Sequence, residues 1–284
     1  MKVSYFPGCS LDGTAIEYNE SLRWTSEQLG LDLQELPDWN CCGSSSAHVT
    51  NDKLAVSLAG RNLLIADKMD MDLMVPCAAC FHRLKFADKA LKAGQSVLGS
   101  NQSYQGNFKI KSSADLIWEN VGEKALTAKV RKPLTGLQPV CYYGCLTVRP
   151  PRITDAPDPE NPMAMDEIMK VLGADVKNWS FKADCCGGNI MLTHPELAKK
   201  MVKKLLDMAL EAGANCIVAG CPLCQSNLDT RQNEILNQNS QPYNIPVYYF
   251  SELMGLAYGD PHLENYLNKH LTDAKSLLAQ KGLL

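Results

Sequence analysis

Short runs of strand-forming residues alternate along the chain with longer segments of helical periodicity. Early in the chain, residues 2–6, 31–36 and 72–75 have the first pattern, and residues 51–69 have the second. The apolar residues expected on one face of that helix are Leu54, Leu58, Ile65 and Met69.

The same order of elements returns further along the chain. Strand-like runs lie at 139–143, 175–179 and 216–219, and Thr193 with Glu196 has the capping-box pattern that opens a helix. The apolar positions expected to face the core on this helix are Met201, Val202, Leu205 and Ala209.

A fourth strand and helix close each half, at 107–111 and 115–118 and again at 247–250 and 252–254. The order β-α-β-α-β-α-β therefore occurs twice. This alternation predicts an α/β fold of two Rossmann-like repeats, related by a pseudo-two-fold axis and built on parallel sheets. Ligands of such sheets gather beyond the carboxyl ends of the strands, and the cysteines of this chain follow the predicted strands.

Ten of the twelve cysteines form two similar sets of five, which we call the first and second quintets. The first is Cys9, Cys41, Cys42, Cys77 and Cys80, and the second is Cys145, Cys185, Cys186, Cys221 and Cys224. In both quintets, 34 residues separate the adjacent pair from a Cys-x-x-Cys motif. The remaining Cys141 and Cys216 lie outside the repeat, and we expect them to be buried structural residues.

The two quintets indicate an internal duplication. The pairs and the Cys-x-x-Cys motifs recur at an offset of 144 residues, but the leading cysteines recur at 136, so the second half carries eight additional residues. Residues 149–162 hold five prolines and are predicted to be the inserted loop. We expect a first repeat at 1–136 and a second at 137–284.

Charge and hydropathy exclude several classes of function. Lys and Arg total 28 against 31 Asp and Glu, without a basic run, which argues against a nucleic-acid binder. No stretch approaches the roughly 18 apolar residues of a membrane span, and the N-terminus lacks the pattern of a secretory signal. A reducing cytoplasm is the expected compartment, where thiols stay reduced unless a metal or catalysis uses them.

The cysteine pattern favours iron–sulfur clusters. Five thiolates exceed the four that a structural zinc ion takes, and adjacent cysteines suit two irons of one cluster. Gly43 and the pair at 187–188 would donate backbone amides to the cluster, and each Cys-x-x-Cys opens a helix whose N-terminus stabilises thiolates. One zinc ion in a repeat, with a spare cysteine, stays open as an alternative.

At these residues the chain resembles the cysteine-rich CCG domains of the B subunit of heterodisulfide reductase, the catalytic subunit of that enzyme. Both repeats of the C-x(31–39)-CC-G-x-C-x-x-C type are complete and span essentially the whole chain. The resemblance implies two non-cubane [4Fe-4S] clusters, the first bound by Cys9, Cys41, Cys42, Cys77 and Cys80 and the second by Cys145, Cys185, Cys186, Cys221 and Cys224. These cysteines would be catalytic through the clusters that they bind.

The resemblance also implies an activity and partners. The substrate would be the CoM-S-S-CoB heterodisulfide of methanogenesis, reduced to coenzyme M and coenzyme B thiols as each cluster delivers one electron to one sulfur. The chain has no dinucleotide fingerprint and no ferredoxin cysteine run, so electrons must come from a partner. The implied partners are the small ferredoxin-like subunit and the flavin-bearing subunit of the reductase, with an associated hydrogenase or formate dehydrogenase.

Two other functions stay open. CCG domains also occur in electron-transfer or disulfide-reducing subunits of other oxidoreductases, linked to non-methanogenic thiols and disulfides, lactate, glycolate, fumarate or quinones. A non-catalytic zinc protein is the third hypothesis. Complete motifs in both halves favour the disulfide reductase.

Several further residues are candidates for secondary roles. The basic residues near the motifs, which could bind an anionic substrate or be solvated surface charges, are His82, Arg83, Lys85, Arg149 and Arg152. His48 and His194 are candidate proton donors. Residues 263–284 read as an amphipathic helix that packs on the body or meets a partner.

Overall fold

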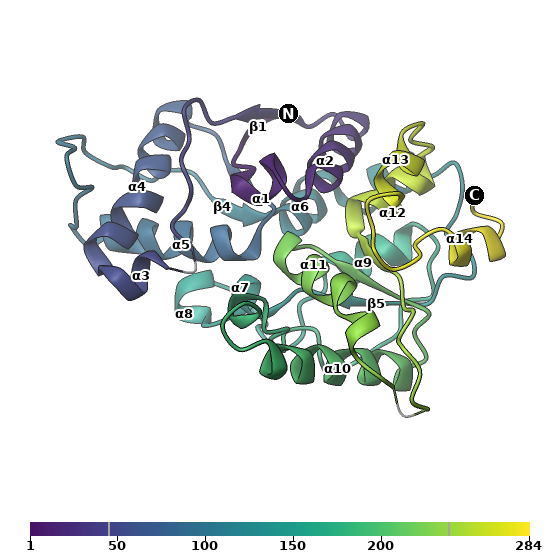
Figure 1. Ribbon diagram of the computed structural model, residues 1–284. Helices are drawn as coiled ribbons and strands as arrows, with labels where there is room; N and C mark the ends of the chain where they lie inside the picture. The colour runs from purple at the N-terminus through teal and green to yellow at the C-terminus, as the bar shows by residue number, and fades with distance from the viewer. Residues whose placement is uncertain (45, 238) are drawn as a thin grey trace.

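The computed structural model describes residues 1–44, 46–237 and 239–284 (Figure 1). It contains two sheets in which every paired strand is parallel. The first sheet has the order β2-β1-β3-β4, with β1 at Lys2–Tyr5, β2 at Asp32–Glu35, β3 at Leu73–Val75 and β4 at Ile110–Ser112. The second has the order β5-β6-β7, with β5 at Pro139–Tyr142, β6 at Cys216–Ala219 and β7 at Val247–Tyr249. The predicted α/β class with parallel sheets is confirmed.

Helices follow the strands in both halves of the chain. Those of the first half are α1 (Gly8–Asp12), α2 (Ile16–Gln28), α3 (Ala47–Thr50), α4 (Asp52–Met69), α5 (Ala78–Lys92) and α6 (Ser113–Thr127). Those of the second half are α7 (Cys145–Val148), α8 (Pro151–Thr154), α9 (Ala164–Val171), α10 (Pro195–Glu211), α11 (Pro222–Thr230), α12 (Phe250–Tyr258), α13 (Leu263–Leu267) and α14 (Ser276–Gln280). Two 3-10 turns lie at Gly188–Ile190 and Gln232–Glu234.

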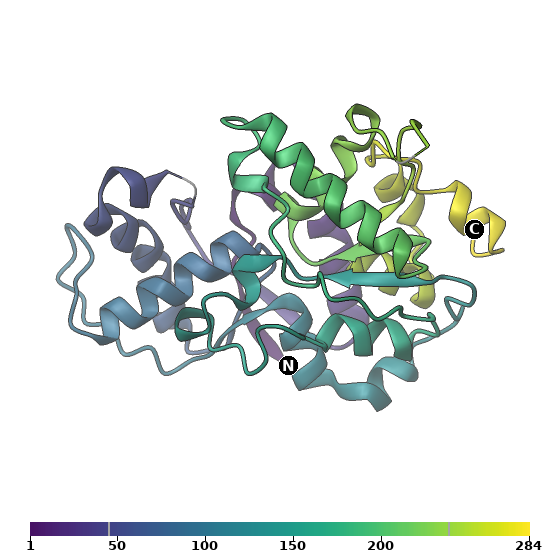
Figure 2. The same cartoon turned by 90° about the horizontal axis from the view of Figure 1, so that it is seen from below.

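Helices of each half pack against helices of the other half where the two halves meet. Helix α6 of the first half packs against α9 of the second, and α12 of the second packs against α2 of the first, so that purple α2 lies beside yellow α12 in Figure 1. The rings of Tyr18 and Tyr249 stack at 4.2 Å between centroids, and Ser21 and Ser251 share a hydrogen bond of 2.7 Å. Helix α10, at the lower edge of Figure 1, faces the viewer in Figure 2 and covers the outer side of the second half.

The strand predicted at 175–179 is not formed. The Asp175 and Lys177 amides donate to the carbonyls of Leu137 and Pro139, at 2.9 and 2.8 Å, so this segment follows β5 without a continuous ladder. Trp179 is instead held by its side chain, because its indole Nε1 donates to the Cys141 carbonyl at 3.0 Å.

Three helix predictions also need correction. Leu54 on α4 is exposed, and the buried stripe is formed by Val56, Ala59, Leu63 and Ala66. The expected capping box is wrong, because α10 begins at Pro195 without a side-chain cap. The core face predicted for α10 is correct in part, since Val202, Leu205 and Ala209 are buried but Met201 is only partly so.

Two further segments contain more structure than the sequence predicted. The insertion at 149–162 contains the short helix α8. Residues 263–284 form two short helices, α13 and α14, rather than one. Leu263 and Leu278 are buried there, so the C-terminal segment packs on the body.

A buried ion pair fastens this C-terminal segment to α12. His270 Nε2 lies 3.0 Å from Glu252 Oε1, and both side chains are almost fully buried. The other Glu252 oxygen accepts the Tyr249 amide at 2.9 Å. Burial lowers the pKa of His270, but the Glu252 carboxylate outweighs this effect and raises it to about 9.

We therefore expect the free energy of unfolding to fall as pH rises from about 7 to about 10. A raised histidine pKa stabilises the fold fully below the unfolded pKa of about 6.5, and this stability is lost as pH passes the folded value; the shift corresponds to about 3 kcal/mol. Urea unfolding under reducing conditions at both pH values tests this. The double variant E252Q/H270Q should lose this pH dependence. The wild type and the control variant H262Q, which keeps His270, should both show it. An unchanged pH dependence in the double variant would contradict the assignment.

Candidate functional site

The first quintet gathers at the carboxyl ends of β1, β2 and β3. Cys42 Sγ lies 3.1 Å from Cys80 Sγ. The Cys41 thiol is hydrogen-bonded to Cys42, and Cys9 is near enough to influence Cys41 electrostatically. Cys77 is the N-cap of α5 and is hydrogen-bonded to Cys80. Three of these thiols are buried, whereas Cys9 and Cys41 are exposed.

The second quintet repeats this arrangement. Cys186 Sγ lies 3.8 Å from Cys224 Sγ, Cys145 is hydrogen-bonded to Cys185, and Cys221, the N-cap of α11, is hydrogen-bonded to Cys224. All five side chains line one small cavity, to which Ala78 and Ala79 of the first half also contribute.

The two quintets touch each other. The thiols of Cys77 and Cys221, which are the first cysteines of the two Cys-x-x-Cys motifs, lie close enough across the boundary between the halves for each to shift the pKa of the other. Both side chains are buried. The ten cysteines therefore form two adjoining groups rather than two separate sites.

Neighbouring thiols have pKa values shifted in opposite directions. Hydrogen bonding with Cys41 and Cys80 lowers the pKa of Cys42 to about 4, and hydrogen bonding with Cys145 lowers that of Cys185 to about 6. The pKa values of the donors Cys41 and Cys145 are raised. Backbone amides assist, since the Gly187 N–H donates to Cys185 Sγ at 3.3 Å.

Two glycines let the leading cysteines approach their partners. Gly8 and Gly144 precede Cys9 and Cys145 with φ of 70° and 72°, a region that glycine adopts readily. A Cβ atom on Gly8 would lie 3.0 Å from Cys80 Sγ, and one on Gly144 would lie 2.8 Å from Cys224 Sγ. Side chains at these positions would displace the sulfurs of both quintets.

The donor set fits sulfur-ligated iron. Each group offers five thiols together with backbone amides that donate to sulfur, as iron–sulfur sites require. The sulfurs meet in pairs, and in the described part of the chain no three His, Cys, Asp or Glu side chains form a ready site for a metal ion. A bound cluster would therefore replace the thiol protons that now hold these pairs together.

The other sequence candidates lie in different surroundings. Arg83 Nη2 lies 2.8 Å from His48 Nδ1, and the neighbouring His82 is buried. Lys85 is paired with Asp155 of the insertion at 2.5 Å. The remaining candidates lie elsewhere. Arg149 is paired with Glu160, and Arg152 and His194 are exposed. Cys141 and Cys216 are buried inside strands.

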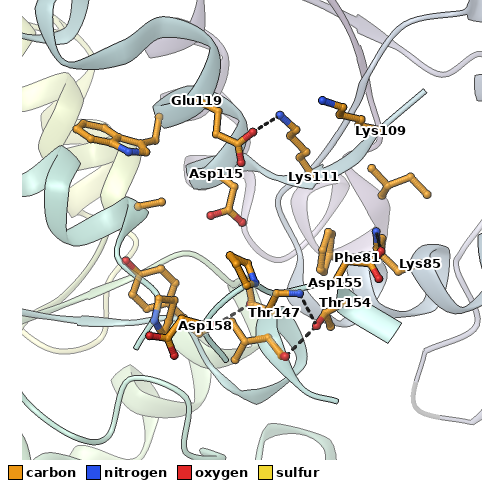
Figure 3. Close-up of a pocket in the computed structure, with 18 of the residues that line it drawn as sticks. Phe81, Lys85, Lys109, Lys111, Asp115, Glu119, Thr147, Thr154, Asp155 and Asp158 are labelled. Atoms are coloured by element: carbon orange, nitrogen blue, oxygen red, sulfur yellow. Dashed lines mark hydrogen bonds and ion pairs between the residues drawn. The ribbon is translucent and has the colours of Figure 1, made fainter. Parts of the chain in front are cut away.

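A cavity of about 720 Å³, not predicted from the sequence, lies between the halves (Figure 3). Its walls come from α5, β4 and α6 on one side and from α7, α8 and the insertion on the other. Phe81, next to Cys80, and Thr147, two residues after Cys145, both line it. A separate, much smaller pocket shares Tyr143 and Thr147 with this cavity and is also lined by Ala78 and Gly220, which are next to Cys77 and Cys221 in the chain.

A buried ion pair lies behind the part of the cavity wall that Tyr143 and Pro162 form. Lys182 Nζ lies 2.8 Å from Asp166 Oδ1, and both side chains are almost fully buried. The Tyr143 hydroxyl donates to the other Asp166 oxygen at 2.7 Å. The Lys182 carbonyl accepts the amides of Tyr143 and Gly144, so this network positions the backbone that leads into Cys145.

Comparison with known proteins agrees with this geometry. The CCG cysteine-rich domain matches residues 3–85 and 140–229, which together hold all ten quintet cysteines. The chain belongs to the CCG cysteine-rich domain family. Membership in this family supports iron–sulfur clusters as the cofactor of the chain.

Relatives in the family match over nearly the full chain. The 8-methylmenaquinol:fumarate reductase membrane anchor subunit of Wolinella succinogenes is 33% identical over 96% of this chain and 98% of its own length. The B subunit of the ferredoxin:CoB-CoM heterodisulfide reductase of Methanosarcina mazei is 27% identical over 91% of this chain and 89% of its own length. None of the described helices here is long and apolar enough to cross a membrane.

One solved structure has the same fold. A hypothetical protein from Helicobacter pylori superposes with a TM-score of 0.74 at 11% identity, over 95% of this chain. This chain spans 52% of that protein's length, and the likeness concerns the fold alone.

We expect G8A and G144A each to reduce the iron content of anaerobically purified protein. The added methyl group meets a cysteine sulfur and strains a backbone with positive φ. The matched control is G30A, because Gly30 has a φ of 73° but no described atom within 4 Å of its added Cβ. Equal iron loss in all three variants would mean that backbone strain, and not crowding of the sulfurs, is responsible.

Proposed function

We propose that the chain is the catalytic subunit of an oxidoreductase complex that reduces a small disulfide between two iron–sulfur clusters. The observation that carries the proposal is the contact between Cys77 and Cys221, because it brings the two quintets to one point. A disulfide has two sulfurs that each need one electron, and two adjoining sites of the same kind match this requirement. The relatives named as B subunits of heterodisulfide reductases support it.

The groups proposed for these sites are two non-cubane [4Fe-4S] clusters, one in each of the repeats 1–136 and 137–284. When bound, each cluster supplies one electron to one substrate sulfur. The chain's own residues then have three tasks, which are to hold the clusters, to admit the substrate and to keep the two sites in contact.

The cavity between the halves is the proposed entrance for the substrate. It is wide enough for a small organic molecule, and lysines and carboxylates both line it, among them Lys109 and Asp115 (Figure 3). Lys111 is paired with Glu119 of the same cavity, so Lys109 is the lysine proposed to attract the acidic groups of a substrate such as CoM-S-S-CoB. A much smaller pocket that shares Tyr143 and Thr147 with this cavity is lined by Ala78 and Gly220, the neighbours of Cys77 and Cys221 in the chain.

Electrons would reach the chain from other subunits of the complex. The proposed partners are a small ferredoxin-like subunit and a flavin-bearing subunit, linked to a hydrogenase or formate dehydrogenase, in the cytoplasm. The relatives' names support a place in a multi-subunit reductase.

A second candidate function is electron transfer in a quinol- or fumarate-linked complex. It is favoured by the 33% identity to a menaquinol:fumarate reductase subunit over 98% of that protein. In this case both clusters would pass electrons between partners without reducing a disulfide.

Protein purified without oxygen should hold about eight iron atoms and eight sulfides per chain, and should reduce CoM-S-S-CoB with a reduced viologen dye. C80S and C224S should each lose about half of the iron and essentially all of the activity, because one electron per sulfur requires both sites. Iron, sulfide and zinc analysis with a dye-oxidation assay measures this.

The control is C216A, which removes a buried thiol outside the quintets and should keep both iron and activity. Eight irons without disulfide reduction would favour the electron-transfer function. Zinc in place of iron would refute both proposals.

A further inference from the structure

The two halves differ in charge beside their quintets, and we propose that Arg83 makes the first site the more electropositive one, so that the cluster bound there is reduced at the higher potential. This inference rests on the proposed function, in which both quintets hold clusters. It ranks the reduction potentials of two sites that the duplication alone would make equal.

Arg83 and Asn227 occupy equivalent positions. Each lies three residues after the second cysteine of a Cys-x-x-Cys motif, Cys80 or Cys224, at an offset of 144. Residues three apart share a helix face, so both side chains lie on the cysteine side of α5 and α11. The Asn227 side chain shows what this position reaches, since its Nδ2 donates to the Cys186 carbonyl at 2.7 Å.

Arg83 reaches the matching place in the first half. Its guanidinium lies near enough to Cys42, the counterpart of Cys186, for the two groups to interact electrostatically. The group is half-buried, and its Nη2 lies 2.8 Å from His48 Nδ1. Within residues 1–44, 46–237 and 239–284, Arg83 has no salt bridge to a carboxylate, so its charge is not cancelled by an acidic partner.

A second pair of positions differs in the same direction. Asn40 and Asp184 each precede the adjacent cysteines of their half. Asn40 is neutral, and its Nδ2 donates to the Cys41 carbonyl at 2.8 Å. Asp184 carries a carboxylate directly beside Cys185 in the chain, and its salt bridge to Lys204, at 3.2 Å, is solvent-exposed.

These differences act on the same equilibrium. Reduction adds one electron to a cluster and removes one from the donor, so a nearby positive charge stabilises the reduced form and a nearby negative charge destabilises it. Arg83 favours the electron at the first site, and Asp184 disfavours it at the second.

The test is an EPR-monitored redox titration of the iron-loaded protein, in which C145S and C9S variants identify the signals of the first and second sites. R83N places the residue of the second half at this position. It should make the equilibrium constant for one-electron reduction of the first site at least tenfold less favourable, which lowers its potential by about 59 mV. R83K keeps the charge and should retain most of the potential. K124N, an equal charge change at an exposed site on α6, should shift neither signal.

D184N gives an independent measurement if R83N does not fold. It should raise the potential of the second site, and the double variant R83N/D184N should bring the two potentials together. Unchanged potentials in R83N and D184N, or equal shifts at both sites, would overturn the inference. Iron analysis of the same samples separates the two failures, because eight irons with no shift refute only this inference, whereas fewer than eight in wild type refute the proposed function.

Discussion

The contact between Cys77 and Cys221 is the constraint on which the rest of the structure depends. These are the first cysteines of the two Cys-x-x-Cys motifs, and their thiols meet in a buried position. The buried sulfurs near that point cannot all be ionised without compensating positive charge, since like charges in a poorly solvated site repel strongly. Protons shared unevenly between neighbouring thiols meet this requirement here, and iron would meet it in the loaded protein.

The fold maintains this contact through helix packing and an apolar core that the two halves share. Helix α6 of the first half packs against α9 of the second, and α12 of the second half packs against α2 of the first. The apolar cores follow the same rule, since Leu63 and Val75 belong to one buried cluster together with Val140 and Leu205. Tyr18 of α2 adds a direct link, because its hydroxyl donates to the carbonyl of Gly220 beside Cys221. Neither quintet can shift without a change in the packing of the opposite half.

The sequence was sufficient for the features that depend on local patterns. Apolar runs such as 216–219 predict strands because burial on both faces selects them, and the fixed interval of 34 residues groups the cysteines. The segment at 175–179 has the same local character, but it lies beside β5 and its Trp179 is held by a side-chain hydrogen bond. For α4, apolar residues occur on more than one face, and the contact with α5 selects the stripe that contains Ala59.

Features that join distant segments could not be predicted in this way. The walls of the cavity include Lys109, Tyr143 and Asp155, which share no spacing or motif. The contact of the quintets likewise depends on how the halves are placed, and no interval in the sequence encodes it. Gly8 and Gly144 were visible as repeated residues before the leading cysteines, but their importance follows from the distance to a sulfur that is far away in the chain.

The insertion shows how the duplicated fold departs from symmetry, and the strengths of its ion pairs indicate which contact matters. Asp155 is paired with Lys85 and Lys89 of α5, but its side chain is 53% exposed, and such pairs contribute about 0–1 kcal/mol. Lys182 and Asp166 are 1% and 3% exposed, and loss of one partner from a buried pair costs about 3–5 kcal/mol. The end of the insertion is held by this pair, because Lys182 Nζ also donates to the Pro162 carbonyl at 3.2 Å. The cavity wall is therefore anchored at the end nearer to Tyr143 and Cys145, while the contacts to α5 are the weaker ones.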